Sequence, residues 1–321
     1  MARTFRRAAT AARVCLPLLA LFFGGLNFDG ARAAAATSAP AATTAIAPVA
    51  NQGLVWTVRG PAGGTVFLAG SIHLLRADDA ALPAALEHAY REAGRLVMEI
   101  DLSAVDPAAA AAFTAQHGVY ESGEGLRRNL GKRRWQKAQA EFERLGLDLA
   151  AFDQLEPWAV ALVYSVTSLT QRGFEPTLGV EEQLKARALA DGKPIGGLET
   201  LEYQLGLFDR LTPADQARLL ELTLSETTDQ LSDIDALTRA WRAGDETTLT
   251  RLLLREYRRF PRLYAPLVHD RNRNWLPQVE ALLHELGSTL LVVGALHLVG
   301  SQGLVSLLRE RGLMVEPFQP H

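Results

Sequence analysis

The chain has 321 residues and a mass of 34.9 kDa, and 48% of its residues are hydrophobic while 21% are charged. This composition excludes an intrinsically disordered or low-complexity protein, and the length allows one large domain or two ordinary ones. The net charge of -3 and the isoelectric point near 6.2 argue against a nucleic-acid-binding protein, because such proteins neutralise phosphates with a basic surface.

The first 36 residues have the three parts of a secretory signal peptide. Four arginines precede an apolar segment at 14–26, and small residues at 31–36 offer cleavage sites. The apolar segment is shorter than the roughly 20 residues that a membrane-spanning helix needs. A lipid anchor on Cys15 is excluded, because the apolar segment follows that cysteine. We therefore predict a periplasmic or secreted protein with no stable membrane anchor after cleavage.

Removal of the signal peptide changes the chemistry of the chain. Five arginines and Asp29 leave, so the mature charge is near -7, and the only cysteine leaves with them. Disulfide bonds, cysteine-ligated metals and thiol nucleophiles are thereby excluded. Residues 37–52 are rich in Ala, Thr and Pro and are predicted to be a flexible leader, whereas residues 53–321 are predicted to form a single domain.

Strand and helix signals alternate at the start of this domain. Apolar, β-branched segments at 54–59 and 65–70 flank a Gly-rich turn at 60–64, which is typical of a β-hairpin. Helical spacing at 82–93 predicts a helix, and the apolar segment 95–102 predicts a third strand.

The middle of the chain, about 107–286, is predicted to be a long helical block. Residues 158–169 form an apolar segment of helical length, and Thr212 caps a helix predicted at 214–224. Within the block, a helix is expected at 179–189 and a short strand at 193–198.

Strand character returns in the C-terminal part, with a buried strand at 288–294, a helix at 304–311 and a last strand at 314–318. We therefore predict an α/β or α+β fold with a central mixed sheet. The helical block is expected to be inserted between two similar strand ends of that sheet.

Those two strand ends carry the same motif, in which an apolar strand continues into Gly-x-x-His-Leu. The first copy contains Gly70 and His73, and the second contains Gly294 and His297. Ligands of open α/β sheets bind at the carboxyl ends of the strands. The matching contexts therefore favour a functional role for both imidazoles, while the other histidines lack this context.

Glu99 is a further candidate, because it lies near the end of the strand predicted at 95–102. A carboxylate there is costly to bury unless it is paired, binds a cation or is protonated. Asp101 shares its strand face at a spacing of two, although a solvated strand edge is an equally good interpretation.

These residues and motifs together resemble the TraB/GumN family, which is related to the TIKI metalloproteases. The resemblance covers nearly the whole mature chain, and it includes GSIHLL at 70–75, MEIDL at 98–102, PTLGVEE at 176–182, Arg271-Asn272, and the segment 294–318. Members of this family resemble a wider group that includes erythromycin esterases and haem-binding ChaN-like proteins. The resemblance implies a site made of the residues His73, Glu99, Arg271, Asn272 and His297. Where relatives usually have Gly-Ile-Asp, this chain has Gly179-Val180-Glu181.

Two reaction schemes fit this set of residues. In the first, His73, His297 and Glu99 bind a divalent metal, manganese, cobalt or zinc, that activates a water. In the second, one histidine is a general base oriented by Glu99, and the other histidine with Arg271 stabilises the oxyanion. The TIKI resemblance favours the metal-dependent scheme, which we prefer, and the esterase resemblance favours the other.

The expected substrate is a peptide or small molecule with an amide or ester bond, and no nucleic acid is expected as a partner. A non-enzymatic protein that binds haem or another ligand is the remaining alternative. The sequence contains no His-Glu-x-x-His, Gly-x-Ser-x-Gly, P-loop or Gly-x-Gly-x-x-Gly motif, so other common mechanisms lack support. The sequence predicts neither the identity of the substrate within this class nor the oligomeric state.

Overall fold

A central six-stranded sheet organises the fold. The computed structural model describes residues 52–121, 123–224, 229–257 and 260–319, so the predicted signal peptide and most of the leader lie outside the described residues. The strand order is β4-β3-β5-β2-β1-β6. The strands are β1 (Val55–Arg59), β2 (Thr65–Ser71), β3 (Arg95–Ile100), β4 (Ile195–Glu199), β5 (Ser288–Gly294) and β6 (Val315–Pro317). Strands β4, β3, β5 and β2 are parallel, and β1 is antiparallel to both β2 and β6. The predicted mixed α/β fold is thus confirmed.

The central strands are apolar because both of their faces are covered. In β5, all residues from Thr289 to Gly294 are buried, as parallel strands between layers of helices require. The predicted hairpin joins β1 and β2, and its turn is closed by a bond from Gly60 N to Gly64 O of 2.8 Å. Gly63 has φ of 96° in this turn, a conformation that favours glycine.

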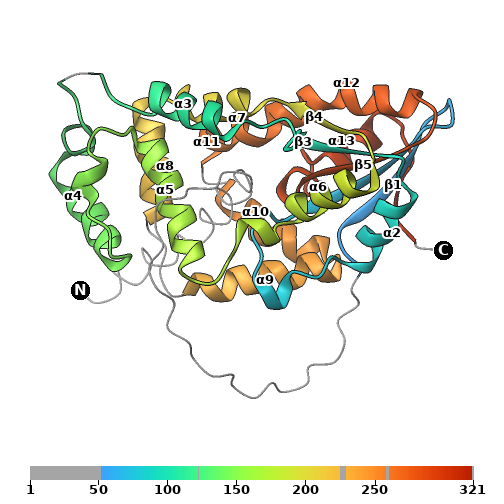
Figure 1. The fold of residues 1–321 in the computed structure, drawn as a ribbon, viewed down its shortest axis with the longest axis horizontal. Coiled ribbons are helices and arrows are strands. Elements are labelled where there is room, and N and C mark those ends of the chain that lie inside the picture. The colour runs from blue at the N-terminus through green and yellow to red at the C-terminus, as the bar shows by residue number, and fades with distance from the viewer. Residues whose placement is uncertain (1–51, 122, 225–228, 258–259, 320–321) are drawn as a thin grey trace, which may run out of the picture.

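The helices follow the predicted order, and they separate into helices beside the sheet and a distant helical region (Figure 1). Near the sheet lie α2 (Ala84–Glu92), α6 (Val180–Asp191), α12 (Asp270–His284) and α13 (Leu304–Glu310). Three more helices reach the ends of the sheet, namely α7 (Leu201–Asp209), α9 (Asp229–Ala243) and α10 (Glu246–Tyr257), through contacts with Glu99, Gly70 and the turn at 295–297. The remaining helices are α3 (Pro107–His117), α4 (Leu126–Arg144), α5 (Pro157–Thr170), α8 (Pro213–Leu224) and α11 (Pro261–Tyr264). Helix α4 lies at the end of the molecule farthest from the sheet.

The apolar interior of the helical region is continuous with the core of the sheet. Most side chains of α5 are buried, as its apolar sequence predicts, and α5 packs against α8. Trp158 of α5 is fully buried, as are Trp241 of α9 and Trp275 of α12. In the part of the chain that the structure describes, no helix combines the length and apolar character needed to cross a membrane.

The order of the strands brings the two motif-bearing ends together. Strands β2 and β5 are parallel neighbours, with Gly70 opposite Val293 and Ser71 opposite Gly294. Strand β3 flanks β5 on its other side, and β4 flanks β3. Because all four strands run in the same direction, the residues that follow each of them meet at one edge of the sheet.

Candidate active site

Arg271 is at the centre of a buried polar cluster at this edge. Its side chain comes from the first turn of α12 and is 0% exposed. Its Nη2 donates to Glu99 Oε2 at 2.5 Å and to Glu199 Oε1, while Nε donates to the same Glu199 oxygen at 2.8 Å. Its Nη1 donates to Leu267 O at 3.2 Å and lies 3.0 Å from His297 Nε2. These contacts use all five N–H groups of the guanidinium.

His297 is held in one tautomer by its neighbours on α12. Its Nδ1 lies 2.7 Å from Asn272 Oδ1, and Asn272 Nδ2 donates to the backbone oxygens of His297 (3.2 Å) and Gln302 (2.7 Å). Since the amide oxygen only accepts, Nδ1 of His297 carries the proton and Nε2 accepts from Arg271. Burial, with the charge of Arg271, lowers the pKa of His297 to about 3 against the opposing effect of Glu99. His297 is therefore neutral at physiological pH.

Glu99 is buried and ionised in the same cluster. Its Oε1 accepts from Gly294 N at 2.7 Å, and its Oε2 accepts from Arg271 and from Gln204 Nε2 at 3.1 Å. Burial by itself would raise the pKa of Glu99, but Arg271, with smaller contributions from His297, His73 and the Gly294 amide, lowers it to about 2. Both of its carboxylate oxygens are thus engaged in hydrogen bonds.

His73 is in a different environment from His297. Its Nδ1 lies 2.7 Å from Glu181 Oε1, and the same oxygen accepts a hydrogen bond from Ser71 Oγ. Its buried Nε2 has no hydrogen-bond partner among the described residues. Burial alone would lower the pKa of His73, but the charge and hydrogen bond of Glu181 outweigh it, and the pKa is raised above its ordinary value.

Local geometry explains how His73 meets Glu181. Helix α6 begins directly beside the end of β2, where Val180 N donates to Ile72 O at 3.1 Å. A Cβ atom at Gly179 would lie only 2.0 Å from His73 O, so this approach requires glycine. The Gly179-Val180-Glu181 segment is the one that departs from the family pattern. Its longer acidic side chain nevertheless reaches the imidazole.

A π-helical turn precedes the residues that α12 contributes. Residues Ala265–His269 form this turn, and Leu267 within it supplies the carbonyl that accepts from Arg271. Such turns often occur next to functional residues. The turn leads directly into Arg271 and Asn272.

The structure brings most of the predicted site residues into direct contact. Arg271 touches both Glu99 and His297, and Asn272 touches His297. His73 lies at the end of the neighbouring strand, and the charges of Glu99 and Arg271 act on its pKa. Asp101 does not extend the strand, because β3 ends at Ile100, and its carboxylate accepts from Ser103 N at 2.9 Å in the following turn.

Sequence reasoning missed two members of the cluster, Glu199 and Gln204. Glu199 ends β4, and it accepts from Arg271 and from Trp275 Nε1 at 3.0 Å. Gln204 of α7 joins the two carboxylates, because its Nε2 donates to Glu199 Oε1 at 2.8 Å and to Glu99. Glu199 directly follows the strand predicted at 193–198, and that signal was available in the sequence.

The donor atoms do not fit the three-residue metal site of the first scheme. Both imidazoles donate from Nδ1 to an oxygen, which is an orientation that metal-binding histidines share. However, Nε2 of His297 faces the Arg271 guanidinium at 3.0 Å, and both oxygens of Glu99 accept from N–H donors. Among the described residues, no group of three His, Cys, Asp or Glu side chains is arranged to hold a metal ion.

Comparisons with known proteins confirm the resemblance found in the sequence. A protein of Escherichia coli (strain K12), described as "Uncharacterized protein YbaP", is 26% identical over 253 residues, which are 78% of this chain and 89% of that protein. Its counterpart of the same description in Shigella flexneri is 27% identical over 246 residues, which are 75% of this chain and 87% of that protein. No solved structure matches significantly. The TraB/PrgY/gumN family matches residues 54–317, and the chain belongs to this family.

Proposed function

We propose that the protein is a hydrolase of ester or amide bonds in which His73 is the general base. One observation carries this proposal. The Nδ1 of His73 is bound to Glu181 at 2.7 Å, while its buried Nε2 has no hydrogen-bond partner among the described residues. A carboxylate that orients an imidazole in this way leaves the lone pair on the other nitrogen ready to accept a proton.

The proposed reaction uses His73 twice. Its Nε2 takes a proton from a water molecule, whose oxygen attacks the carbonyl carbon, and the imidazolium then returns the proton to the leaving oxygen or nitrogen. Glu181 stabilises the imidazolium that forms between the two steps. Because the charge and hydrogen bond of Glu181 raise the pKa of His73, its deprotonated imidazole is a stronger base than that of an ordinary histidine.

The second histidine has a different role in this proposal. His297 has both ring nitrogens engaged, and Arg271 has every N–H group committed. Neither residue therefore has a free donor for an oxyanion in this arrangement. We assign Arg271, Asn272 and His297 as positioning residues that fix Glu99 beside the His73 site. The pKa of His73 is raised and that of His297 is lowered. Such a separation of the pKa values of two similar groups is typical of acid–base sites.

Activity against a panel of peptides, aryl esters and acyl amides tests the proposal. We expect His73→Ala to lower kcat by about 100-fold to 10,000-fold, which is the usual contribution of a general base. His284→Ala is the matched control, since His284 is exposed at the end of α12. Full activity of His73→Ala against the substrates that the wild type cleaves would contradict the proposal.

The same panel separates the general-base scheme from its two alternatives. Activity that disappears with a chelator and returns with manganese, cobalt or zinc would support the metal-dependent scheme, to which the shared Nδ1 orientation of the two histidines gives some support. A Soret band in the absorption spectrum of the purified protein, with no turnover of any substrate, would support haem binding.

Export is part of the proposal. The support is the arginine-rich start, the apolar segment at 14–26 and the small residues at 31–36. Mass spectrometry of the protein recovered from an exporting host should find an N-terminus between about residues 33 and 37. An intact Met1 in the membrane fraction would contradict export.

A further inference from the structure

Helix α4 carries an unusual concentration of positive charge. Of the twelve residues at 126–137, six are Lys or Arg and none is Asp or Glu, although the mature chain is acidic. Arg134 pairs with Glu221 of α8 at 2.8 Å. The other five side chains are exposed and form what we call the basic face, which consists of Arg127, Arg128, Lys132, Arg133 and Lys137.

The positions of these charges do not favour the stability of the helix. Gly131, with φ of 71°, interrupts α4, so a new helical segment begins at Lys132. Cations in a first helical turn oppose the helix dipole, and the like charges of Arg133 and Lys137 are four residues apart and repel each other. The acidic residues Glu141 and Glu143 are in the last turns, where they too oppose the dipole. The Lys and Arg residues of α4 therefore do not serve to stabilise the helix.

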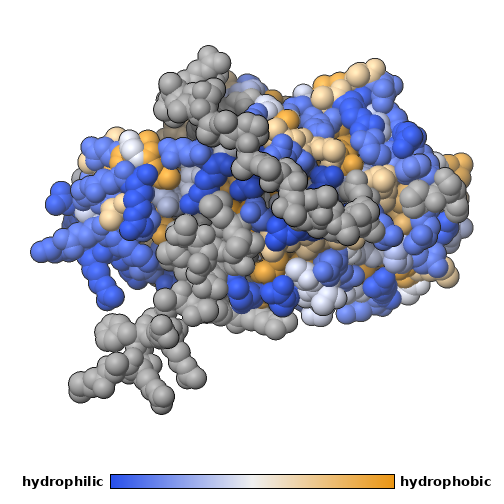
Figure 2. Space-filling view, turned by 90° about the horizontal axis from the view of Figure 1, so that it is seen from below, coloured by the Kyte–Doolittle hydropathy of each residue, from blue (hydrophilic) through white to orange (hydrophobic). Residues whose placement is uncertain are grey.

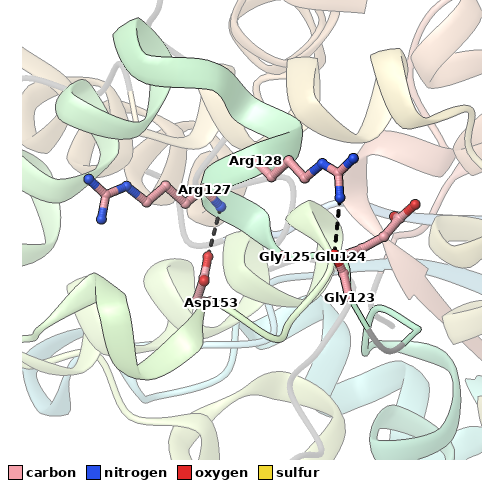
Figure 3. Close-up of a pocket in the computed structure, with 6 residues that line it drawn as sticks. All are labelled: Gly123, Glu124, Gly125, Arg127, Arg128 and Asp153. Atoms are coloured by element: carbon pink, nitrogen blue, oxygen red, sulfur yellow. Dashed lines mark hydrogen bonds between the residues drawn. The ribbon is translucent and has the colours of Figure 1, made fainter.

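The basic face has neither a suitable pocket nor an apolar anchor. A cavity of about 420 Å³ is lined by Arg127 and Arg128 of this face, but its lining also includes Glu124 and Asp153 (Figure 3). Asp153 already accepts from Arg127 N at 2.8 Å. The apolar side chains of α4, such as Trp135 and Phe142, are buried inside the protein. A small anion therefore lacks a defined site, and a protein partner lacks the buried aromatic or aliphatic contacts that usually anchor an interface.

We infer that the basic face adsorbs to the anionic headgroups of a phospholipid bilayer. Several long, exposed cationic side chains on one helix, without an inserting apolar residue, match the requirements for electrostatic attraction to an anionic surface. The end of the molecule formed by α4 is largely hydrophilic (Figure 2), and it lies away from the sheet edge that carries His73 and His297. Adsorption through α4 would thus leave the candidate active site at a distance from the membrane.

Co-sedimentation with lipid vesicles tests this inference on the full chain. We expect stronger binding to vesicles of equimolar phosphatidylglycerol and phosphatidylcholine than to phosphatidylcholine alone, with the difference abolished by high salt. The combined variant Lys132→Glu, Arg133→Glu and Lys137→Glu should bind the anionic vesicles about 100-fold more weakly, because each basic residue contributes roughly fivefold. Every variant keeps the same N-terminal segment, so binding through that segment is common to all.

A second triple variant controls for net charge. Arg91→Glu, Arg239→Glu and Arg262→Glu change the charge by the same amount at exposed positions on other helices, and this variant should retain most of the binding. Thermal melting tests whether the three substitutions in α4 destabilise the fold. Acidic residues in a first helical turn interact favourably with the helix dipole. The α4 variant should therefore melt at the same or a higher temperature than the wild type.

Three results would overturn the inference. The first is equal binding of the wild type to both kinds of vesicle, and the second is undiminished binding of the α4 variant to anionic vesicles. The third is displacement of the protein from anionic vesicles by duplex DNA at an equal concentration of phosphate, which would make nucleic acid the preferred partner. A lower melting temperature of the α4 variant together with unchanged binding would assign the basic residues a structural role.

Discussion

The neutral, buried His297 predicts a specific dependence of stability on pH. Its pKa is about 3 in the folded protein and 6.5 in its ordinary state, so the unfolded chain binds a proton that the folded protein excludes between these values. Stability contributed by neutral His297 is therefore present above pH 6.5 and is lost as the pH falls toward 3. At 1.36 kcal/mol for each pKa unit, the whole loss is roughly 5 kcal/mol.

The perturbation is His297→Gln, which keeps a hydrogen-bond acceptor near Arg271 but removes the titrating group. Between pH 6.5 and 5.0, the wild type should lose about 2 kcal/mol of unfolding free energy that the variant does not lose. The contribution of His73 has the opposite sign, because its raised pKa makes that contribution complete below pH 6.5. Glu99 loses its stabilising charge only below pH 4.5, so Glu99 does not contribute to the change in this window.

Urea denaturation of both proteins at several pH values from 5.0 to 6.5 measures the difference. The variant will have a lower absolute stability, since the bond to Asn272 is lost, so the slope against pH is the quantity to compare. Groups such as Glu199 and His269 titrate in both proteins and cancel in this comparison. Equal slopes would refute the reasoning, as would an NMR titration in which His297 of the folded wild type has an ordinary pKa.

Three further predictions follow from the same contacts. Glu181→Gln should lower the pKa of His73, seen by imidazole NMR, and should move the rise of activity with pH to lower pH; an unchanged His73 pKa would contradict the pairing. Arg271→Met should cost about 3–5 kcal/mol in urea denaturation, because it leaves two carboxylates buried without a countercharge, and a loss below about 1 kcal/mol would contradict this. Gly179→Ala should destabilise by about 1–3 kcal/mol and lower activity, since its Cβ would lie 2.0 Å from His73 O. Gly196→Ala is its control, with the nearest atom 3.9 Å away, and equal effects of the two would contradict the steric argument.

The strand ends of the site were predictable from sequence, and the chemistry of the side chains was not. Apolar strands followed by Gly-x-x-His place His73 and His297 at a sheet edge, because the period and length of the segments report burial. The sequence does not report which nitrogen of each ring is engaged. That difference depends on Glu181 and Asn272, which come from helices whose placement against the sheet is a tertiary property.

The hydrogen-bond partners of Glu99 are a second example of contacts that the sequence alone did not predict. A carboxylate at the end of a buried strand requires a partner, and the sequence offered a metal ion or one of the two histidines as that partner. The structure gives Glu99 the guanidinium, the Gly294 amide and Gln204. Glu199, which shares the guanidinium, follows a short strand inside a helical block, where the surrounding helical pattern obscured its role.

The position of β5 has a consequence for how the chain folds. This strand is among the last segments of the chain, yet it lies between β2 and β3, which are made early. The sheet edge that carries His73 and Glu99 therefore cannot form until nearly the whole polypeptide is present, and contacts of such high sequence separation form slowly. For a chain threaded across a membrane before it folds, this order delays the compact state until translocation is nearly complete. The candidate active site would then assemble only in the compartment where the finished protein resides.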